Sequence, residues 1–300
     1  MIKFLFKTFS KTNIFIVSIL FFLILPFVIS NRFIITEILV YSILGISFNL
    51  LLGYVGLLSF GHALYFGSGA YGMALLLIHF NVNIFVGILV GMVVGAFFAL
   101  CVGLVSIKKH GVYFSMLTLS FGEMVYFTAL KLRDLTGGEN GLSVIRPSFE
   151  IFNLFSLSLE SPLRFYYFVF FFFGATLFIF RRIVNSPFGK VLQIIRENEE
   201  RAKTLGYNVN THKLIAFVIS GAFSGLSGAL YCLTIKFVHC GDLQWTKSGE
   251  PVIMTLIGGT GSLYGPIIGA IIQTFLSDLI SRLWQRWLFI LGIIFYYLRF

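Results

Sequence analysis

Two ionisable side chains lie inside apolar stretches, and they are the first candidates for chemistry. Glu123 occurs in "LSFGEMVYF", and His62 occurs in "GYVGLLSFGHALYFGSGAYG". Ionisable groups are costly inside a bilayer and are functional candidates by default. Glu123 is interpreted either as a gate or helix-anchoring group facing a pore, or as a carboxylate paired with a neighbouring helix. His62 has no companion His, Asp or Glu cluster, so a hydrogen-bonding role is favoured over a metal site.

Catalytic and nucleotide-binding patterns are not found in the sequence. An intramembrane enzyme needs a nucleophile–base pair or metal ligands, and His62 with scattered serines supplies neither. The segment "GGTGSLYG" at 258–265 is rich in glycine, but it lacks the lysine of a phosphate loop. We therefore expect no catalytic residue, no metal and no cofactor on this chain, so any ATP must bind to a partner. The three cysteines show no CxxC spacing, which predicts neither a zinc site nor a disulfide framework.

The composition predicts the class of protein that positions these residues. Hydrophobic residues make up 58% of the chain and charged residues 11%, whereas soluble domains are nearer 45–50% and about 25%. The apolar runs are long enough to cross a hydrocarbon layer. We predict one all-α, polytopic permease domain over 1–300 with about 8–10 transmembrane helices, some broken or re-entrant. The expected spans are 14–30, 33–52, 63–80, 84–106, 112–130, 164–180, 214–236, 251–280 and 283–299, of which 251–280 is too long for one plain helix.

The basic residues predict the orientation, because cytoplasmic loops collect Lys and Arg. With the N-terminus inside, 14 of the 22 Lys and Arg residues fall in inner loops. The basic N-terminus imitates a signal peptide, but no cleavage site follows, so we expect a retained first span. The connection 131–163 is then outside and 181–213 inside. The net charge of +10 reflects this topology, and no soluble basic domain is present to bind nucleic acid.

Glycines make residues 53–72 unusual for a membrane helix. Gly53, Gly56 and Gly61 occur there with Ser59, and glycine is unfavourable inside a helix. Static helix packing is one interpretation; the other is a broken or re-entrant segment beside a translocation path. Glycines at four-residue spacing favour close helix packing elsewhere; they are Gly87, Gly91, Gly95 and Gly103 with Ala99, then Gly221 and Gly225, then Gly261, Gly265 and Gly269.

The inner connection 181–213 predicts a short surface helix. Ser186 is a suitable N-cap, Pro187 suits the first helical position, and Gly206 suits the C-terminal stop. The first half carries an apolar stripe, and the second half is charged, with Glu197–Arg201 and Glu199–Lys203 in the favoured i, i+4 order. The helix either rests on lipid or docks a soluble partner. Its acidic residues argue mildly against lipid.

Five stretches, in the same order along the chain, resemble the branched-chain amino-acid ABC transporter permeases of the LivM type. They are "GYVGLLSFGHALYFGSGAY", "GVYFSMLTLSFGEM", "LTGGENGL", "RENEERAKTLGYNV" followed by "KLIAFVISGAFSGLSGALY", and "EPVIMTLIGGTGSLYGPIIGA". The resemblance covers roughly residues 35 to 275. The ending "GIIFYYLRF" departs from the family's pattern.

The resemblance implies a permease subunit that forms half of a pore in a bacterial inner membrane. Its partners would be a second, LivH-like permease subunit, two cytoplasmic ATP-binding subunits and a periplasmic substrate-binding protein. Loop 131–163 would be periplasmic and loop 181–213 would couple to the ATPases. The coupling residues would be Arg196, Glu197, Asn198, Glu199, Ala202 and Gly206; Ala202 would permit close approach, and the charges would fix the register.

The substrates implied by the resemblance are leucine, isoleucine and valine, although relatives with the same machinery import urea or short amides. Candidate residues of the substrate pathway are Gly53, Gly56, Ser59, Gly61, His62, Glu123, Gly258 and Gly259. An ion-coupled secondary transporter is the alternative class. Such a protein should carry more intramembrane carboxylates than Glu123 or a matched pair of broken helices, so it is less favoured.

Overall fold

The computed structural model describes residues 11–29, 31–80, 82–146, 149–151, 155–157 and 160–283, and within them it is almost entirely helical. The long helices are α2 (Lys11–Val28), α3 (Arg32–Asn49), α4 (His62–Phe80), α5 (Ile84–Ser106), α6 (Val112–Lys131), α8 (Pro162–Asn185) and α11 (Val209–Ile235). The remaining helices are η1 (Leu50–Val55), α7 (Arg133–Thr136), η2 (Gly138–Asn140), α9 (Pro187–Glu197), α10 (Glu199–Thr204), η3 (Cys240–Leu243), α12 (Trp245–Gly258) and α13 (Gly265–Leu283).

The prediction of an all-α, polytopic membrane protein is confirmed. Among the described residues, five helical segments are long and apolar enough to cross a bilayer: Arg32–Val55, His62–Phe80, Ile84–Ser106, Pro162–Asn185 and Val209–Ile235. Phe15–Val28 and Gly265–Ser281 are shorter apolar helices. Each of the expected spans from 14–30 to 214–236 coincides with a helix, whereas 283–299 lies almost wholly outside the described residues.

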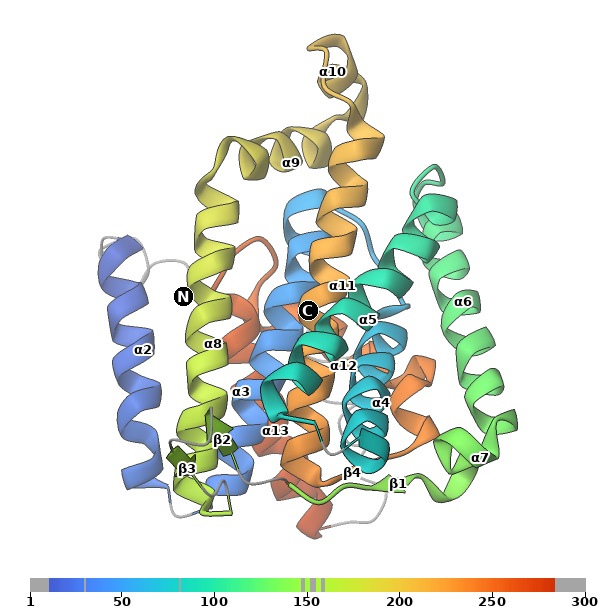
Figure 1. The fold of residues 1–300 in the computed structure, drawn as a ribbon. Helices are drawn as coiled ribbons and strands as arrows, with labels where there is room; N and C mark the ends of the chain where they lie inside the picture. The colour runs from blue at the N-terminus through green and yellow to red at the C-terminus, as the bar shows by residue number, and fades with distance from the viewer. Residues whose placement is uncertain are drawn as a thin grey trace.

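The bundle has two distinct ends (Figure 1). Helices α9 and α10 lie at one end, which we call the α9 end. The strands lie at the other, the β1 end; they are β1 (Leu142–Ser143), β2 (Phe149–Ile151), β3 (Phe155–Leu157) and β4 (Phe237–Val238). The two long connections therefore lie at opposite ends of the molecule. That geometry agrees with the predicted placement of 131–163 and 181–213 on opposite sides of the membrane.

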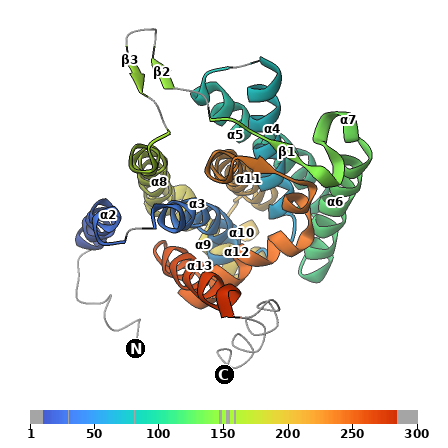
Figure 2. The ribbon, with the colours of Figure 1, turned by 90° about the horizontal axis from the view of Figure 1, so that it is seen from below.

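Helix α3 lies near the centre, with α8, α11 and α13 around it when the molecule is viewed along the bundle (Figure 2). The glycine spacing explains how α4, α5 and α11 come together beside it. A Cβ on Gly225 would lie 2.4 Å from the Gly91 carbonyl oxygen, and a Cβ on Gly228 would lie 1.8 Å from the Phe66 oxygen. These backbones therefore touch directly, which is how helices associate in lipid. The prediction that these glycine runs allow close helix packing is confirmed.

The expected span 251–280 is two helices rather than one. Helix α12 and helix α13 pack against each other and are joined by residues 259–264. Gly259 and Gly261 have φ values of +95° and +81°, which side-chain-bearing residues rarely adopt, so the chain reverses there. A Cβ on Gly269 would lie 1.8 Å from the Met254 carbonyl oxygen, so the two helices are in backbone contact.

The connection at the β1 end is fastened to the bundle. Gly137, Gly138 and Gly141 all have positive φ, as tight turns require. Strand β1 pairs with β4 in antiparallel register. Arg146 donates to the Leu233 and Thr234 carbonyl oxygens at 2.5 and 2.8 Å. The three cysteines are free, with Cys101 exposed and Cys232 and Cys240 buried.

Candidate translocation and coupling site

The glycine-rich segment is broken between α3 and α4, as one of the two interpretations predicted. The last turn of the α3 segment is the π-helix η1, after which Gly56 has φ +82° and residues 56–61 leave the helix. Exposed polar backbone is not tolerated in lipid, so these groups must find partners in the protein. Helix α6 supplies two: Ser115 Oγ donates to the Leu58 carbonyl at 2.6 Å, and Thr118 Oγ1 accepts from Phe60 N–H at 3.1 Å.

The start of α4 is held by α12 and α11. Ser248 Oγ accepts the Ala63 N–H at 2.8 Å. His62 is fully buried, and its Nε2 lies 2.9 Å from Ser220 Oγ, which donates to the Ser47 carbonyl at 2.6 Å. Ser59 is also buried, and its Oγ accepts the Gly61 N–H at 3.2 Å. These polar residues hold the break in place, and no group of three or more metal-ligating side chains occurs in the described part of the chain.

Glu123 reaches the beginning of the helical hairpin. Its Oε1 accepts the N–H of Trp245, the first residue of α12, at 3.0 Å. The first N–H groups of a helix have no partner inside the helix, and a negative charge is favourable at this end. Glu123 is thus a helix-anchoring carboxylate that joins α6 to α12, which is one of the roles considered for it.

The inner connection forms two helices, which corrects the expectation of one continuous helix from Ser186 to Gly206. Ser186 caps α9 as predicted, accepting the Gly189 N–H at 3.3 Å. Asn198 then takes an extended conformation, with φ −160°, and its Oδ1 accepts the Arg201 N–H at 3.0 Å as the N-cap of α10. Gly206 ends the segment with φ +85°, as expected of a C-terminal stop.

The break at Asn198 also changes the predicted ion pairs. Lys203 pairs with Glu200 at 2.7 Å, and not with Glu199 as the i, i+4 spacing predicted. Glu199 instead binds Lys213 of α11, whose side chain is 1% exposed, and lies 3.5 Å from His110 Nδ1. The Glu200 pKa is lowered by its hydrogen bond to Lys203. Glu199 therefore fastens α10 to α11, which leaves it less available to a partner than the sequence suggested.

Ala202 is fully buried in a small apolar cluster with Val191, Ile195 and Val209. Its methyl group packs inside the segment, so it fits α10 against α9 instead of lying on an outer surface. The outer surface carries side chains that sequence inspection did not select. Leu205 and Tyr207, which follow α10, are 61% and 39% exposed. Glu197 and Asn198 are also exposed. Exposed apolar residues at the end of a charged helix were the available clue.

Arg196 joins the α9 end to the broken segment. Its Nη1 donates to the carbonyl oxygen of Gly53 in η1. Its stem crosses Gly56, where a Cβ would lie 3.1 Å from Arg196 Cγ, and its guanidinium adjoins Gly261, where a Cβ would lie 3.1 Å from Nη1. Two groups of candidates that the sequence kept separate, the glycine-rich segment and the coupling loop, therefore meet at one side chain.

Asn49 completes this contact from α3. Its Nδ2 donates to the Ser262 carbonyl at 2.9 Å, and its Oδ1 accepts the Gly261 N–H at 3.2 Å. A Cβ on Gly53 would lie 2.2 Å from Asn49 Oδ1 and 2.6 Å from Gly261 N. We call Asn49, Gly53, Arg196 and Gly261 the junction. Gly258 and Gly259 lie just before it, and a Cβ on Gly258 would lie 1.7 Å from the Gly265 carbonyl oxygen.

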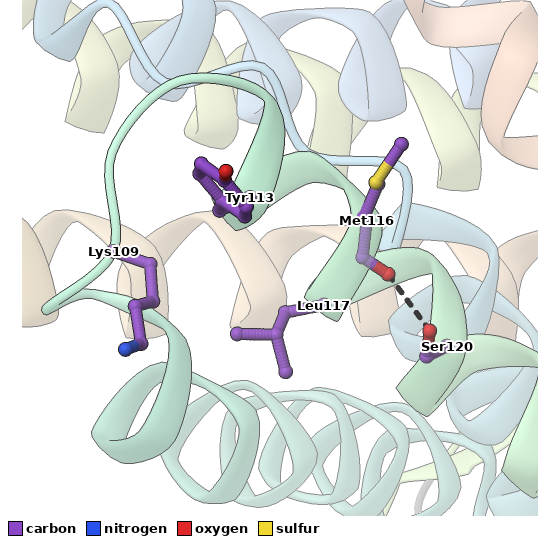
Figure 3. A pocket seen from close by; sticks show the side chains of 5 residues that line it. All are labelled: Lys109, Tyr113, Met116, Leu117 and Ser120. Atoms are coloured by element: carbon purple, nitrogen blue, oxygen red, sulfur yellow. Dashed lines mark hydrogen bonds between the residues drawn. The ribbon is translucent and has the colours of Figure 1, made fainter.

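A hollow between the end of α5 and the start of α6 holds none of the predicted site residues (Figure 3). It is lined by Lys109, Tyr113, Met116, Leu117 and Ser120. The Ser120 hydroxyl donates to the Met116 carbonyl of its own helix at 2.9 Å, and Tyr113 and Met116 are 75% and 62% exposed. Apolar side chains that face outward in this way suit contact with lipid, and we assign no site to the hollow.

Comparison with known proteins supplies the family. The sequence model described as "Branched-chain amino acid transport system / permease component" matches residues 30–298. The chain belongs to this permease family. The match extends to residue 298, within the ending that departs from the expected pattern. As a member of it, the protein is a transmembrane transport subunit.

Individual members of the permease family are similar over most of the chain. The high-affinity branched-chain amino acid transport system permease protein LivM of Escherichia coli is 28% identical, covering 94% of this chain and 72% of its own. The LivM of Salmonella typhimurium is 28% identical, with 89% and 68% covered. An autoinducer 2 import system permease protein, LsrC of Yersinia pseudotuberculosis, is 26% identical, with 64% and 56% covered. No solved structure matches the chain.

Proposed function

We propose that this chain is one permease subunit of an ATP-binding-cassette importer for branched-chain amino acids in a bacterial inner membrane. A second, LivH-like permease subunit would complete the pore. Two cytoplasmic ATP-binding subunits would dock at the α9 end, and a periplasmic substrate-binding protein would deliver leucine, isoleucine or valine at the β1 end. The chain itself would bind no ATP and hold no cofactor.

The junction is the observation that carries this proposal. A docking helix can transmit movement only if it is attached to the element that must move, and Arg196 attaches α9 to η1 and lies against the hairpin loop. A force applied to the α9 end therefore reaches both interruptions in the helical bundle. Coupling of this kind requires an element with two arrangements that both sites bias. The broken segment and the α12–α13 hairpin are the elements of this chain that suit that role.

Reconstituted uptake tests the proposal. The subunit is placed in proteoliposomes with its candidate permease and ATPase partners, and labelled leucine is offered with and without binding protein and ATP. Uptake that requires ATP and both soluble components supports the proposal. Uptake by this chain alone, driven by an ion gradient, would indicate a secondary transporter. ATPase activity that responds only to a binding protein loaded with urea or an amide would replace the proposed cargo.

Docking at the α9 end has a separate test. Reversing the charge of exposed Glu197 with Glu197→Lys should weaken association with the ATP-binding subunits, measured by co-purification in detergent. Glu199 is unsuitable for this purpose, because its substitution breaks the contact with buried Lys213. The control is Glu160→Lys, an exposed carboxylate before α8 at the β1 end. Equal co-purification of both variants would show that the ATPases do not dock here.

A further inference from the structure

A cavity of about 770 Å³ lies at the β1 end, between the start of α3, the end of α11, η3, α12 and the second half of α13. None of the residues proposed for the substrate pathway or for coupling lines it. Its wall holds four carboxyl side chains but few cationic ones, although the chain as a whole carries +10. The charged and titratable acidic and basic residues of the wall are Glu37, Asp242, Glu250, Asp278, Lys247 and His239.

The wall of the cavity includes side chains with buried hydrogen-bonding atoms that have no partner among the described residues. Five buried side-chain atoms are in this state, and three of them belong to this wall: Glu250 Oε2, Gln273 Oε1 and Thr274 Oγ1. The side chains of Gln273 and Thr274 are only 8% and 7% exposed. Buried polar groups in native proteins are almost always paired, so unpaired ones require an explanation.

The cation already present in the wall does not satisfy these atoms. Lys247 Nζ donates to Tyr41 Oη at 2.8 Å and to Glu250 Oε1 at 3.1 Å. It also lies 4.9 Å from the centroid of the Tyr231 ring, within cation–π distance. Lys247 is thus held at one edge of the wall, while the second oxygen of Glu250 and the amide oxygen of Gln273 have no donor in the described part of the chain.

Two unpaired acceptors beside an excess of carboxylates suit a ligand that is positively charged and rich in donors. An ammonium group has three N–H donors and one positive charge. A bound metal ion is less suitable, because no three metal-ligating side chains converge within the described residues. The same wall includes apolar side chains from α3 and α12, namely Phe33, Ile34, Ile253 and Met254, which an aliphatic side chain can contact.

We propose that this cavity is the entry site for the transported amino acid and that Glu250, Gln273 and Thr274 bind its ammonium group. The inference rests on the proposed import of amino acids and assigns the recognition step to the β1 end. The glycine-rich break then acts in gating. The volume is within the range of small-molecule sites, about 300–1,000 Å³.

The test is direct binding to the assembled permease–ATPase complex in nanodiscs, without the binding protein. Saturation-transfer NMR follows the methyl groups of leucine. Leucinol, which keeps the ammonium group and lacks the carboxylate, should displace leucine. 4-Methylpentanoate, which keeps the carboxylate and lacks the ammonium group, should not. The double variant Gln273→Leu/Thr274→Val should bind leucine about tenfold more weakly or worse, as expected for loss of a charge-assisted hydrogen bond.

Thr176→Val on α8 is the matched control. Thr176 is also fully buried, but its hydroxyl donates to the Phe172 carbonyl of its own helix at 2.8 Å. Its substitution should leave leucine binding unchanged. The double variant removes no hydrogen bond that the structure shows among the described residues, so it should co-purify with its partners and melt no lower than the wild type.

Three results would overturn the inference. The first is that 4-methylpentanoate displaces leucine as effectively as leucinol does. The second is that the double variant binds leucine with wild-type affinity. The third is that the double variant fails to assemble with its partners, which would show that the unpaired atoms bond to the second permease. Failure of the importer proposal is distinguishable, because it would appear as absent ATP-driven leucine uptake by the wild-type complex. Normal wild-type uptake with any of the three results rejects the entry site alone.

Discussion

The junction at the α9 end and the cavity at the β1 end are built in opposite ways. At the junction, Asn49 uses both its donor and its acceptor, Arg196 binds a backbone carbonyl, and Gly53 leaves no room for a methyl group. The cavity has about 770 Å³ of space and three buried polar atoms without a partner among the described residues. The junction is close-packed and its polar groups are hydrogen-bonded. The cavity has free space, and three polar atoms of its wall lack a partner among the described residues.

This difference suits the junction to transmitting force and the cavity to binding a ligand. A filled contact transmits displacement, because close-packed groups have low compressibility. An unsatisfied cavity binds, because a ligand can supply the missing hydrogen bonds. The comparison predicts that substitutions at the junction uncouple the transporter without changing its preference for substrate. Substitutions in the cavity should change affinity and leave coupling intact.

The largest effect is expected from filling the junction. Gly53→Ala would place a methyl group 2.2 Å from Asn49 Oδ1 and 2.6 Å from Gly261 N, and overpacking of this kind typically costs about 1–3 kcal/mol. We expect ATP-driven uptake to be lost and the melting temperature to fall. Gly122→Ala is the control, because nothing lies within 4 Å of its added Cβ. Equal uptake by both variants would contradict the importance of the junction.

Removing the side chain that links the two elements should have a smaller effect on stability. Arg196→Ala loses one hydrogen bond to Gly53, and because the guanidinium is on an exposed residue we expect a loss of about 1 kcal/mol. ATP hydrolysis should continue while leucine transported per ATP falls, measured in the same proteoliposomes. Lys190→Ala, an exposed cation on the same helix, should leave the ratio unchanged. An unchanged ratio in Arg196→Ala would show that force does not pass through this contact.

A local effect is expected at the break between α9 and α10. Asn198→Ala removes the side-chain cap of α10, which is typically worth about 1 kcal/mol. Amide hydrogen exchange over residues 199–204 should accelerate about fivefold, since exchange follows local opening. Asn208→Ala, which removes the corresponding cap of α11, should accelerate exchange at the start of α11 and leave 199–204 unchanged. Unaltered exchange in Asn198→Ala would mean that the packing of Ala202 and the contact between Glu199 and Lys213 hold α10 without this cap.

The smallest effect is a shift in the titration of one side chain at the edge of the cavity. A hydrogen bond from His239 Nδ1 to Asp242 Oδ2, 2.9 Å long, raises the His239 pKa, and partial burial opposes this. The pKa of His239 in the folded protein lies above the ordinary value of about 6.5. The His239–Asp242 pair therefore stabilises the folded protein fully below pH 6.5, and this stabilisation is lost as pH rises through the folded pKa. NMR titration should show the raised pKa, and Asp242→Asn should lower it. An equal His239 pKa in both proteins would show that Asp242 does not interact with His239 at the edge of the cavity.

Much of the fold could be predicted from periodicity and composition, because helices in lipid must be long and apolar and must satisfy their own backbone. Gly91 and Gly225 were identifiable as contact positions from their spacing alone. The break at Asn198 was missed, although Asn followed by Glu199 and Glu200 is a typical start of a helix. The length of 251–280 predicted that this segment is not one helix. The position of the chain reversal was not predicted, because the positive φ at Gly259 and Gly261 depends on the tertiary fold.

The sites could be predicted less well, because their partners are distant in sequence. Arg196 was selected as a coupling residue, but its bond to Gly53, 143 positions away, leaves no local pattern. Lys247 and Gln273 were not selected at all. They are ordinary polar residues in helices of mixed composition. Only the fold shows that Lys247 is hydrogen-bonded and that the amide oxygen of Gln273 has no partner among the described residues.

The two hydrogen bonds of Asn49 also set an order in time. The loop 259–264 has polar backbone groups that cannot remain exposed to hydrocarbon, and Asn49 holds two of them. The α12–α13 hairpin can therefore pack only after α3 has folded into the bundle. Asn49 is synthesised more than 200 residues before this loop. Asn49→Asp would replace the Nδ2 amide, which donates to the Ser262 carbonyl, by a negatively charged carboxylate oxygen. Its consequence should appear during biogenesis, as a nascent chain whose hairpin fails to dock and is degraded.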